Sequence, residues 1–245
     1  MTTFTLDTVQ KATRRLSATP WRVVEAQHRA STMRLVDTLD EQRVLEELLD
    51  ASKPTLPAAA MKLHYLLATP FRYPAPPPSG SRFRGIGDPG VWYGADVVHT
   101  ALAEVAYWRL RFLADSLATP DLPPVPHTAF RASIAGNAIV LQQTPFDRQR
   151  KQWEDRVSYD ATQSLARTAR EAGVALIRYR SVRDPQHRAA IAVLTPAAFR
   201  KPAPLAQQVW LIKVARAQVL AETDLGGERL AFAPEELGLP RPRVD

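Results

Sequence analysis

Residues 90–104 read GVWYGADVVHTALAE, an aromatic run that changes within a few residues into an Ala- and Leu-rich segment. Trp92 and Tyr93 favour an extended backbone, whereas the Ala-rich segment that follows favours a helix. Asp96 is a suitable N-cap between the two. We expect this helix to continue to about Ser116, with Glu104 on the flank of its apolar stripe. The stretch therefore predicts a strand, a turn and a helix that carries one carboxylate close to its buried side.

The remaining segments mix expected helices and strands without regular β-α-β alternation. Helical spacing of apolar residues occurs in residues 37–51, from residue 61, and in residues 159–172. Strands are expected at residues 128–133, 138–142, 174–184, 189–194 and 209–220. This order predicts an α+β fold with mixed or antiparallel sheets and flanking helices. Residues 1–65 are interpreted as an N-terminal helical extension, and residues 66–245 as the main domain.

Composition excludes several classes of chemistry. The 245-residue chain contains no cysteine, so disulfides, thiol nucleophiles and cysteine-ligated metals are ruled out. It has no run of ~18 apolar residues and no secretory signal pattern, which favours a cytoplasmic protein without a membrane partner. The formal charge of +7 comes mainly from scattered Arg, a pattern that favours a small anionic ligand. A basic nucleic-acid-binding module is the distant alternative.

Familiar catalytic motifs do not account for the chain. Residues 85–90, GIGDPG, match G-x-G-x-x-G, but a strand-like run follows where a dinucleotide site needs a helix. We interpret this segment as a turn. The histidines lack the spacing of metal ligands, and there is no G-x-S-x-G elbow or Walker loop. No metal site is expected.

A scattered polar set gives the most specific signal. It consists of Arg72 in PFRY, Arg82 in GSRFR, Tyr93 in VWYGAD, Glu104 in TALAEV and Ser181 in IRYRSVRD. This order resembles the RES domain family, which is named after its Arg, Glu and Ser. The resemblance covers about residues 65–215 and is most specific over residues 80–109.

Two positions depart from the family pattern or compete within it. Arg84 stands where many members of the family have Asn. Arg22, in ATPWR, competes with Arg72 as the first Arg of the family. Arg72 is preferred because it lies closer in sequence to Arg82, as the corresponding residue does in the family.

The resemblance implies an ADP-ribosyltransferase-like fold and a function. RES domains of this type are NAD-degrading toxins of RES–Xre toxin–antitoxin systems, so residues 66–245 are expected to form the catalytic domain. The implied activity is cleavage of NAD+ at the nicotinamide–ribose bond, as a phosphorylase or glycohydrolase. Transfer of ADP-ribose to a protein target is the alternative. NAD+ is then the substrate, phosphate is a possible co-substrate, and no prosthetic group is expected.

The resemblance also implies partners. An Xre-type antitoxin is expected to bind the chain, with a possible homo-oligomer inside the toxin–antitoxin complex. The chain itself is not expected to contact nucleic acid.

Each candidate residue has an expected role. Glu104, Arg72 and Ser181 are the catalytic candidates, and the substrate-binding candidates are Arg82, Tyr93, Tyr73 and Arg183. Glu104 would supply negative charge to an oxocarbenium-like transition state. The Tyr93 ring would stack on nicotinamide, and Ser181 would hydrogen-bond the amide or ribose. Arg72 and Arg82 would clamp the pyrophosphate or an incoming phosphate.

Overall fold

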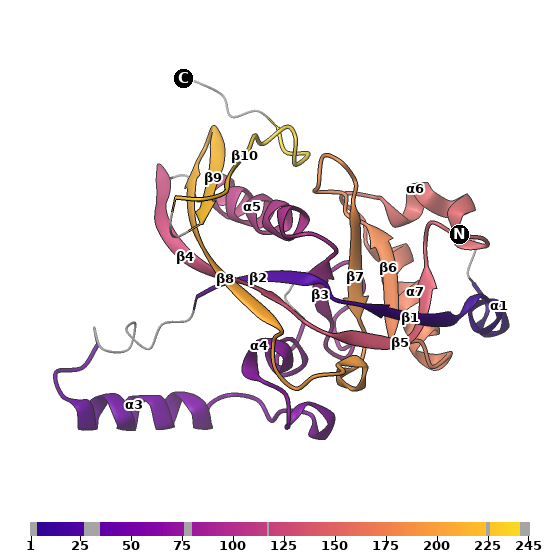
Figure 1. Ribbon diagram of the computed structural model, residues 1–245, viewed down its shortest axis with the longest axis horizontal. Helices are drawn as coiled ribbons and strands as arrows, with labels where there is room; N and C mark the ends of the chain where they lie inside the picture. The colour runs from indigo at the N-terminus through magenta and orange to yellow at the C-terminus, as the bar shows by residue number, and fades with distance from the viewer. Residues whose placement is uncertain (1–3, 27–34, 76–79, 117, 224–225, 241–245) are drawn as a thin grey trace.

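A computed structural model describes residues 4–26, 35–75, 80–116, 118–223 and 226–240. One ten-stranded sheet runs through the molecule in the order β1-β5-β6-β7-β3-β2-β4-β8-β9-β10 (Figure 1). Neighbouring strands are antiparallel except β5 and β6, which are parallel. The strands are β1 (Arg14–Ala18), β2 (Trp21–Glu25), β3 (Trp92–Ala95), β4 (Asp121–Arg131), β5 (Ile134–Val140), β6 (Leu176–Arg180), β7 (Ala189–Val193), β8 (Ala206–Ala215), β9 (Gln218–Thr223) and β10 (Arg229–Phe232). The expected α+β class is confirmed.

Helices lie on both faces of the sheet. The α-helices are α1 (Leu6–Ala12), α3 (Leu39–Ala51), α4 (Tyr65–Ala68), α5 (Val98–Asp115), α6 (Arg150–Trp153) and α7 (Asp160–Glu171). Four 3-10 helices complete the set: η1 (Ala58–Ala60), η2 (Thr69–Phe71), η3 (Phe146–Gln149) and η4 (Pro196–Ala198). α5 and α4 lie on opposite sides of the sheet (Figure 1). Among the described residues, none of these helices is both long enough and apolar enough to cross a membrane.

The alternation of side chains along the strands divides the hydrophobic core into two parts, one on each face of the sheet. Trp92 packs with Phe71 and the α4 residues on one face, whereas Tyr93, the next residue of β3, packs against the core under α5 and α7. Successive side chains of a strand point to opposite faces, so each central strand supplies both cores. Tyr93 and Glu104 therefore lie on the α5 side of the sheet, and Phe71 lies on the α4 side.

The opening stretch folds as its sequence predicts, apart from the helix cap. β3 leads directly into α5, but the N-cap is Val97 and has no side-chain hydrogen bond. Asp96 is instead paired with Arg178 of β6, with 2.5 Å between Oδ2 and Nη2. Arg178 donates to both carboxylate oxygens of Asp96, so this carboxylate faces β6 instead of the helix N–H groups, and the predicted cap was wrong. The Asp96–Arg178 pair ties the start of α5 to β6.

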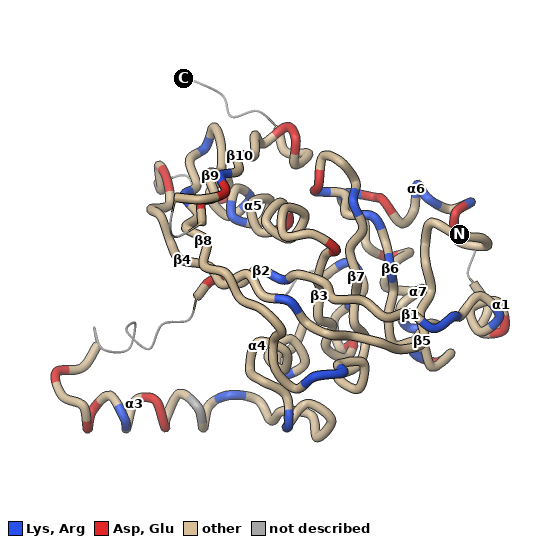
Figure 2. The backbone as a smooth tube through the Cα atoms, in the orientation of Figure 1, with Lys and Arg blue, Asp and Glu red and all other residues tan. Residues whose placement is uncertain are grey.

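The expectation of a purely helical extension over residues 1–65 does not hold for its first part. β1 and β2 belong to the sheet. β2 lies between β3 and β4 and pairs along its whole length with residues 127–131 of β4. Val23 and Val24 are β-branched residues that fit such a central position, and no helical periodicity opposes them. Residues 27–34 lie outside the described part of the chain. The predicted helix at residues 37–51 is confirmed as α3, which projects beyond the sheet and carries a cluster of acidic residues (Figures 1 and 2).

The segment 209–220, predicted as one strand, is a hairpin. β8 ends at Ala215 and β9 begins at Gln218 after a two-residue turn. Trp210, Ile212 and Val214 are buried, and burial then resumes at residues 219 and 221. This change from even to odd positions marks the turn, because a continuous strand keeps its period of two.

Candidate functional site

Glu104 and Ser181 meet on the α5 side of the sheet. Glu104 comes from the second turn of α5, and Ser181 follows the last residue of β6. The Ser181 hydroxyl donates a hydrogen bond to Glu104 Oε1 at 2.6 Å, although the residues are 77 positions apart in the chain. Ser181 is fully buried, and the Glu104 side chain is half-buried. A catalytic candidate and a positioned hydroxyl are thus in direct contact.

The Ser181 hydroxyl has every partner it can use. It accepts hydrogen bonds from the backbone N–H groups of Arg183 and Asp184, each at 3.1 Å. Both lone pairs are therefore engaged, and its single proton is left for Glu104. This turn, in which a serine hydroxyl binds the following backbone, explains why the hydroxyl points at the helix.

Burial and nearby charges act on Glu104 in opposite directions. Desolvation raises the pKa of the Glu104 carboxyl above its usual value of 4.5 and is the largest effect. The Ser181 hydrogen bond and the guanidinium groups of Arg82 and Arg183 lower that pKa, and the charge of Asp184 raises it. Among the described residues, no cation lies within 4.0 Å of the Glu104 carboxylate. The two guanidinium groups therefore influence the Glu104 carboxylate without forming an ion pair with it.

Arg82 and Arg183 are both held almost out of solvent. Arg82 is 8% exposed, donates to the carbonyl of Trp153 at 2.8 Å, and lies 4.9 Å from the ring centre of Tyr159. Arg183 is 3% exposed, donates to the carbonyl of residue 156 at 2.7 Å, and stacks 3.6 Å over the ring of Tyr107. Each bond uses only part of the five-donor guanidinium, so donors remain for an anionic ligand.

Tyr93 fixes the segment that carries Arg82. Its hydroxyl accepts from the N–H of Phe83 at 3.0 Å and is bonded to the hydroxyl of Ser81 at 2.8 Å. Burial raises the pKa of Tyr93, so the phenol stays neutral. Tyr179, which is 5% exposed, interacts electrostatically with Tyr93, Glu104 and Arg82, and its pKa is raised well above 10.0 mainly by burial. Tyr179 is thus a site neighbour that sequence reasoning missed.

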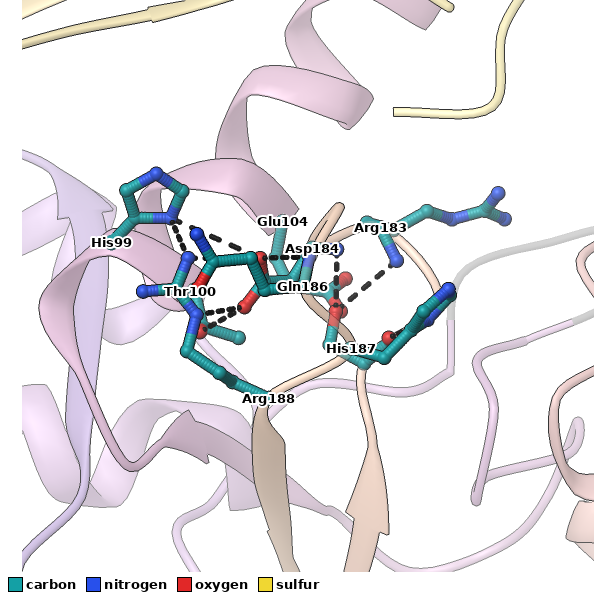
Figure 3. A network of polar contacts seen from close by, with 9 residues as sticks. His99, Thr100, Glu104, Arg183, Asp184, Gln186, His187 and Arg188 are labelled. Carbon is teal, nitrogen blue, oxygen red and sulfur yellow. Dashed lines mark hydrogen bonds and ion pairs between the residues drawn. The ribbon is translucent and has the colours of Figure 1, made fainter. Parts of the chain in front are cut away.

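A second polar network surrounds Asp184, next to Glu104 (Figure 3). Asp184 is 1% exposed and accepts from the Thr100 hydroxyl at 2.5 Å. Arg188 bonds both carboxylate oxygens of Asp184, with Nε at 2.8 Å and Nη2 at 3.0 Å. The same Arg188 Nη2 lies 2.7 Å from His99 Nδ1. None of these four residues was predicted as a site residue, because their only signal was proximity to Glu104 and Ser181 along the chain.

The structure does not bring Arg72 and Tyr73 to the Glu104 carboxylate. Arg72 Nε donates to the carbonyl of Pro54 at 2.8 Å near the surface, and the Tyr73 side chain is 40% exposed. The carbonyl of Tyr73 accepts a hydrogen bond from Arg84 Nη2. Of the seven predicted site residues, Ser181, Arg82 and Arg183 therefore act directly on Glu104, and Tyr93 is bonded to the segment that carries Arg82. Arg72 and Tyr73 remain at the periphery.

Arg22, the competing first arginine, lies beside the site strand. Its Nη1 donates to the carbonyl of Tyr93 at 2.9 Å, and its guanidinium is 5.7 Å from the ring centre of Trp92. Burial lowers the pKa of Arg22 to about 10, and its Nε is buried without a hydrogen-bond partner. Arg22 thus supports the backbone of β3 and points toward the α4 side of the sheet. There it lines a space of about 430 Å³, part of it open to solvent, together with Val24.

Comparison with known proteins gives one family match. The model of the family described as RES domain matches residues 55–213. No curated protein matches the chain. Among solved structures, a similar chain occurs in the crystal structure of the M. tuberculosis MbcT–MbcA toxin–antitoxin complex, with a TM-score of 0.48 and 11% sequence identity. That similarity covers 95% of each chain.

Proposed function

The chain belongs to the RES domain family, and on that premise we propose that it cleaves NAD+ at the nicotinamide–ribose bond and is the toxin of a bacterial toxin–antitoxin system. The observation that carries the proposal is the Ser181–Glu104 pair. A half-buried carboxylate accepts a 2.6 Å hydrogen bond and has two buried guanidinium groups nearby. This combination suits a reaction in which positive charge develops on a sugar that is attached to phosphates.

The chemistry needs a fixed negative charge more than it needs a proton donor. The bond between ribose C1′ and the pyridinium nitrogen breaks, and its electron pair neutralises the ring, so nicotinamide leaves without protonation. Positive charge then develops on C1′ and the ring oxygen, as in glycoside hydrolysis. A carboxylate at Glu104 would stabilise that charge, and Ser181 would hold the carboxylate in position. A phosphate or water oxygen would then form the new bond to C1′.

Arg82 and Arg183 would bind the phosphates of NAD+ or an incoming phosphate. A planar guanidinium binds phosphate oxygens through paired N–H donors, and the interaction is stronger where water is excluded. Their aromatic partners, Tyr159 and Tyr107, hold the two guanidinium planes. Tyr93 would present its ring to nicotinamide, while its hydroxyl is engaged with the segment that carries Arg82.

The assay that tests this function resolves the products of NAD+ turnover. The purified chain is incubated with NAD+ with and without phosphate, and nicotinamide, ADP-ribose and ADP-ribose phosphate are quantified. Glu104→Gln, which keeps the size and can still accept from Ser181, should lower nicotinamide release by about 100-fold or more. NAD+ left intact by the wild-type chain, or full activity in folded Glu104→Gln, would defeat the proposal.

The identity of the acceptor and of the first arginine can be read from the same assay. NAD+ labelled on the adenylate half yields a labelled protein if the chain is an ADP-ribosyltransferase, and a small labelled product if phosphate or water is the acceptor. Arg72→Ala and Arg22→Ala, compared side by side, show which arginine contributes to turnover. We keep Arg72 as a catalytic candidate and Tyr73 as a substrate-binding candidate, because the carbonyl of Tyr73 accepts a hydrogen bond from Arg84, two residues after Arg82.

The proposed biological setting is the cytoplasm, where NAD+ is plentiful. A cognate Xre-type antitoxin would cover the site, with the chain as a possible homo-oligomer in the complex. Expression of the chain alone should then arrest growth and lower cellular NAD+, and co-expression of the protein encoded beside it should restore both. If the Glu104→Gln variant arrested growth at the same protein level, toxicity would not depend on NAD+ cleavage, and this outcome would contradict the proposal.

A further inference from the structure

We propose that Asp184 is a positioning residue that sets the geometry of the Ser181–Glu104 pair, by tying residues 181–188 to the first turn of α5. The proposal rests on the proposed function, because it assigns Asp184 a role in the same reaction. Asp184 itself would not touch the substrate, since its side chain is enclosed by its partners (Figure 3).

The Asp184 carboxylate is saturated with donors. Oδ2 accepts from the Thr100 hydroxyl at 2.5 Å and from Arg188 Nε at 2.8 Å. Oδ1 accepts from Arg188 Nη2 at 3.0 Å and from the N–H of Gln186 at 3.1 Å. Burial raises the pKa of the Asp184 carboxyl, but the hydrogen bonds from Arg188, Thr100 and Gln186 outweigh it and leave the pKa below its usual value. The carboxylate is therefore fixed in position and stays ionised.

These contacts join the two elements that carry the reacting pair. Thr100 and Glu104 are four residues apart on α5, so they lie one above the other on one face of the helix. The N–H of Asp184 donates to Ser181 Oγ, and the N–H of Ser181 donates to the carbonyl of Arg188. A shift of Asp184 relative to Thr100 therefore moves Ser181 relative to Glu104.

The structure indicates that Asp184 acts on the Ser181–Glu104 pair through position rather than through its charge. Arg188 forms an ion pair with Asp184 and offsets its negative charge, and the guanidinium is shared with His99. Thr100 is 0% exposed, and within the described part of the chain its hydroxyl forms a hydrogen bond with Asp184 alone. Geometry at the level of a few tenths of an ångström matters for a 2.6 Å bond.

The test uses a near-isosteric pair of variants at Thr100. Thr100→Val removes the hydroxyl and keeps the shape, whereas Thr100→Ser keeps the hydroxyl. We expect Thr100→Val to lower kcat about 10-fold with KM within about 2-fold of wild type, and Thr100→Ser to restore kcat. The matched control is Thr13→Val, since the hydroxyl of this half-buried threonine donates to the carbonyl of Val9, in the preceding helix, at 2.8 Å. This control should leave kcat unchanged.

Two further measurements keep the outcome unambiguous. If Asp184 acts through Ser181, adding Thr100→Val to Ser181→Ala should cause little further loss of kcat, whereas independent losses would overturn the proposal. Amide hydrogen exchange of Arg183 and Asp184 should accelerate in Thr100→Val and not in Thr13→Val. Unchanged exchange together with unchanged kcat would also overturn it. The exchange result does not depend on NAD+ turnover, so an inactive wild-type chain would defeat the proposed function while leaving the positioning claim to be decided by exchange.

Discussion

Replacing Ser181 by alanine isolates the contact on which the proposed chemistry depends. The variant removes one oxygen that donates to Glu104 at 2.6 Å and accepts from two backbone N–H groups at 3.1 Å. Because Ser181 is 0% exposed, water cannot easily replace the missing oxygen. The perturbation therefore acts on catalysis through Glu104 and on stability through the two N–H groups.

The two effects have different sizes and different readouts. A hydrogen bond to a charged group contributes roughly 1.5–3 kcal/mol, which corresponds to a loss of about 10- to 150-fold in kcat if the bond is fully used in the transition state. Two buried N–H groups without an acceptor cost about 1–3 kcal/mol each before relaxation, so we expect the free energy of unfolding to fall by roughly 2–4 kcal/mol. The loss of the donor also raises the pKa of Glu104, because the Ser181 bond lowers it in the wild type. The acid limb of the kcat profile should move to higher pH.

A double-mutant cycle with Glu104→Gln gives the decisive measurement. kcat for nicotinamide release is measured by chromatography for wild type, Ser181→Ala, Glu104→Gln and the double variant, at a temperature where thermal melts show that all four are folded. If Ser181 acts only through Glu104, its removal from Glu104→Gln should change kcat by less than about 2-fold. Multiplicative losses in the double variant, or an acid limb that does not move in Ser181→Ala, would refute the reasoning.

Three other variants test the surroundings of the site. Glu104→Gln should raise the free energy of unfolding at neutral pH, as measured by urea titration. Burial raises the folded-state pKa of Glu104 above 4.5, so the stability that the protonated carboxyl contributes is fully present below pH 4.5 and is lost as pH rises through the raised pKa. The extra stability of Glu104→Gln over the wild type should therefore vanish in melts below pH 4.5. Arg183→Lys should raise KM for NAD+ about 10-fold or more in steady-state assays, because an ammonium group cannot both stack on Tyr107 and bind phosphate in a fork. Gly90→Ala should lower the free energy of unfolding by about 1–3 kcal/mol, because its Cβ would lie 2.4 Å from the Cα of Phe71; an unchanged melting temperature would contradict that packing.

The sequence predicted helices and turns well where the spacing of apolar residues, or a turn motif, was clear. The helix ending before Gly173 is confirmed as α7, and Gly173 has φ +73°, the left-handed conformation that favours glycine at this position. The predicted turn at residues 85–90 is confirmed in that β3, not a helix, follows it. The resemblance to the RES domain family is confirmed by the family match over residues 55–213. These features depend on neighbours in sequence or on motifs, so the sequence alone carries them.

Features that depend on distant partners were not predictable. Asp96 had the chemistry of a helix cap, yet Arg178, 82 residues away, binds it instead. The strands β1 and β2 were missed because five-residue strands with half-buried faces have little periodicity of their own. Asp184 was missed although it is among the most buried charged residues, because burial of an acid depends on which donors the fold brings to it.

The sequence by itself determined which chemical groups are available: an acid on the flank of a helix, a serine after a strand, and arginines suited to phosphate. It also determined the α+β class, because the order of periodic segments limits how helices and strands can be layered. Only the tertiary structure decided that Ser181 points at Glu104, that Arg82 and Arg183 flank the pair, and that Arg72 lies at the periphery. The physical reason is that a hydrogen bond acts over about 3 Å, whereas these groups are separated by tens of residues and meet only when the strands pair.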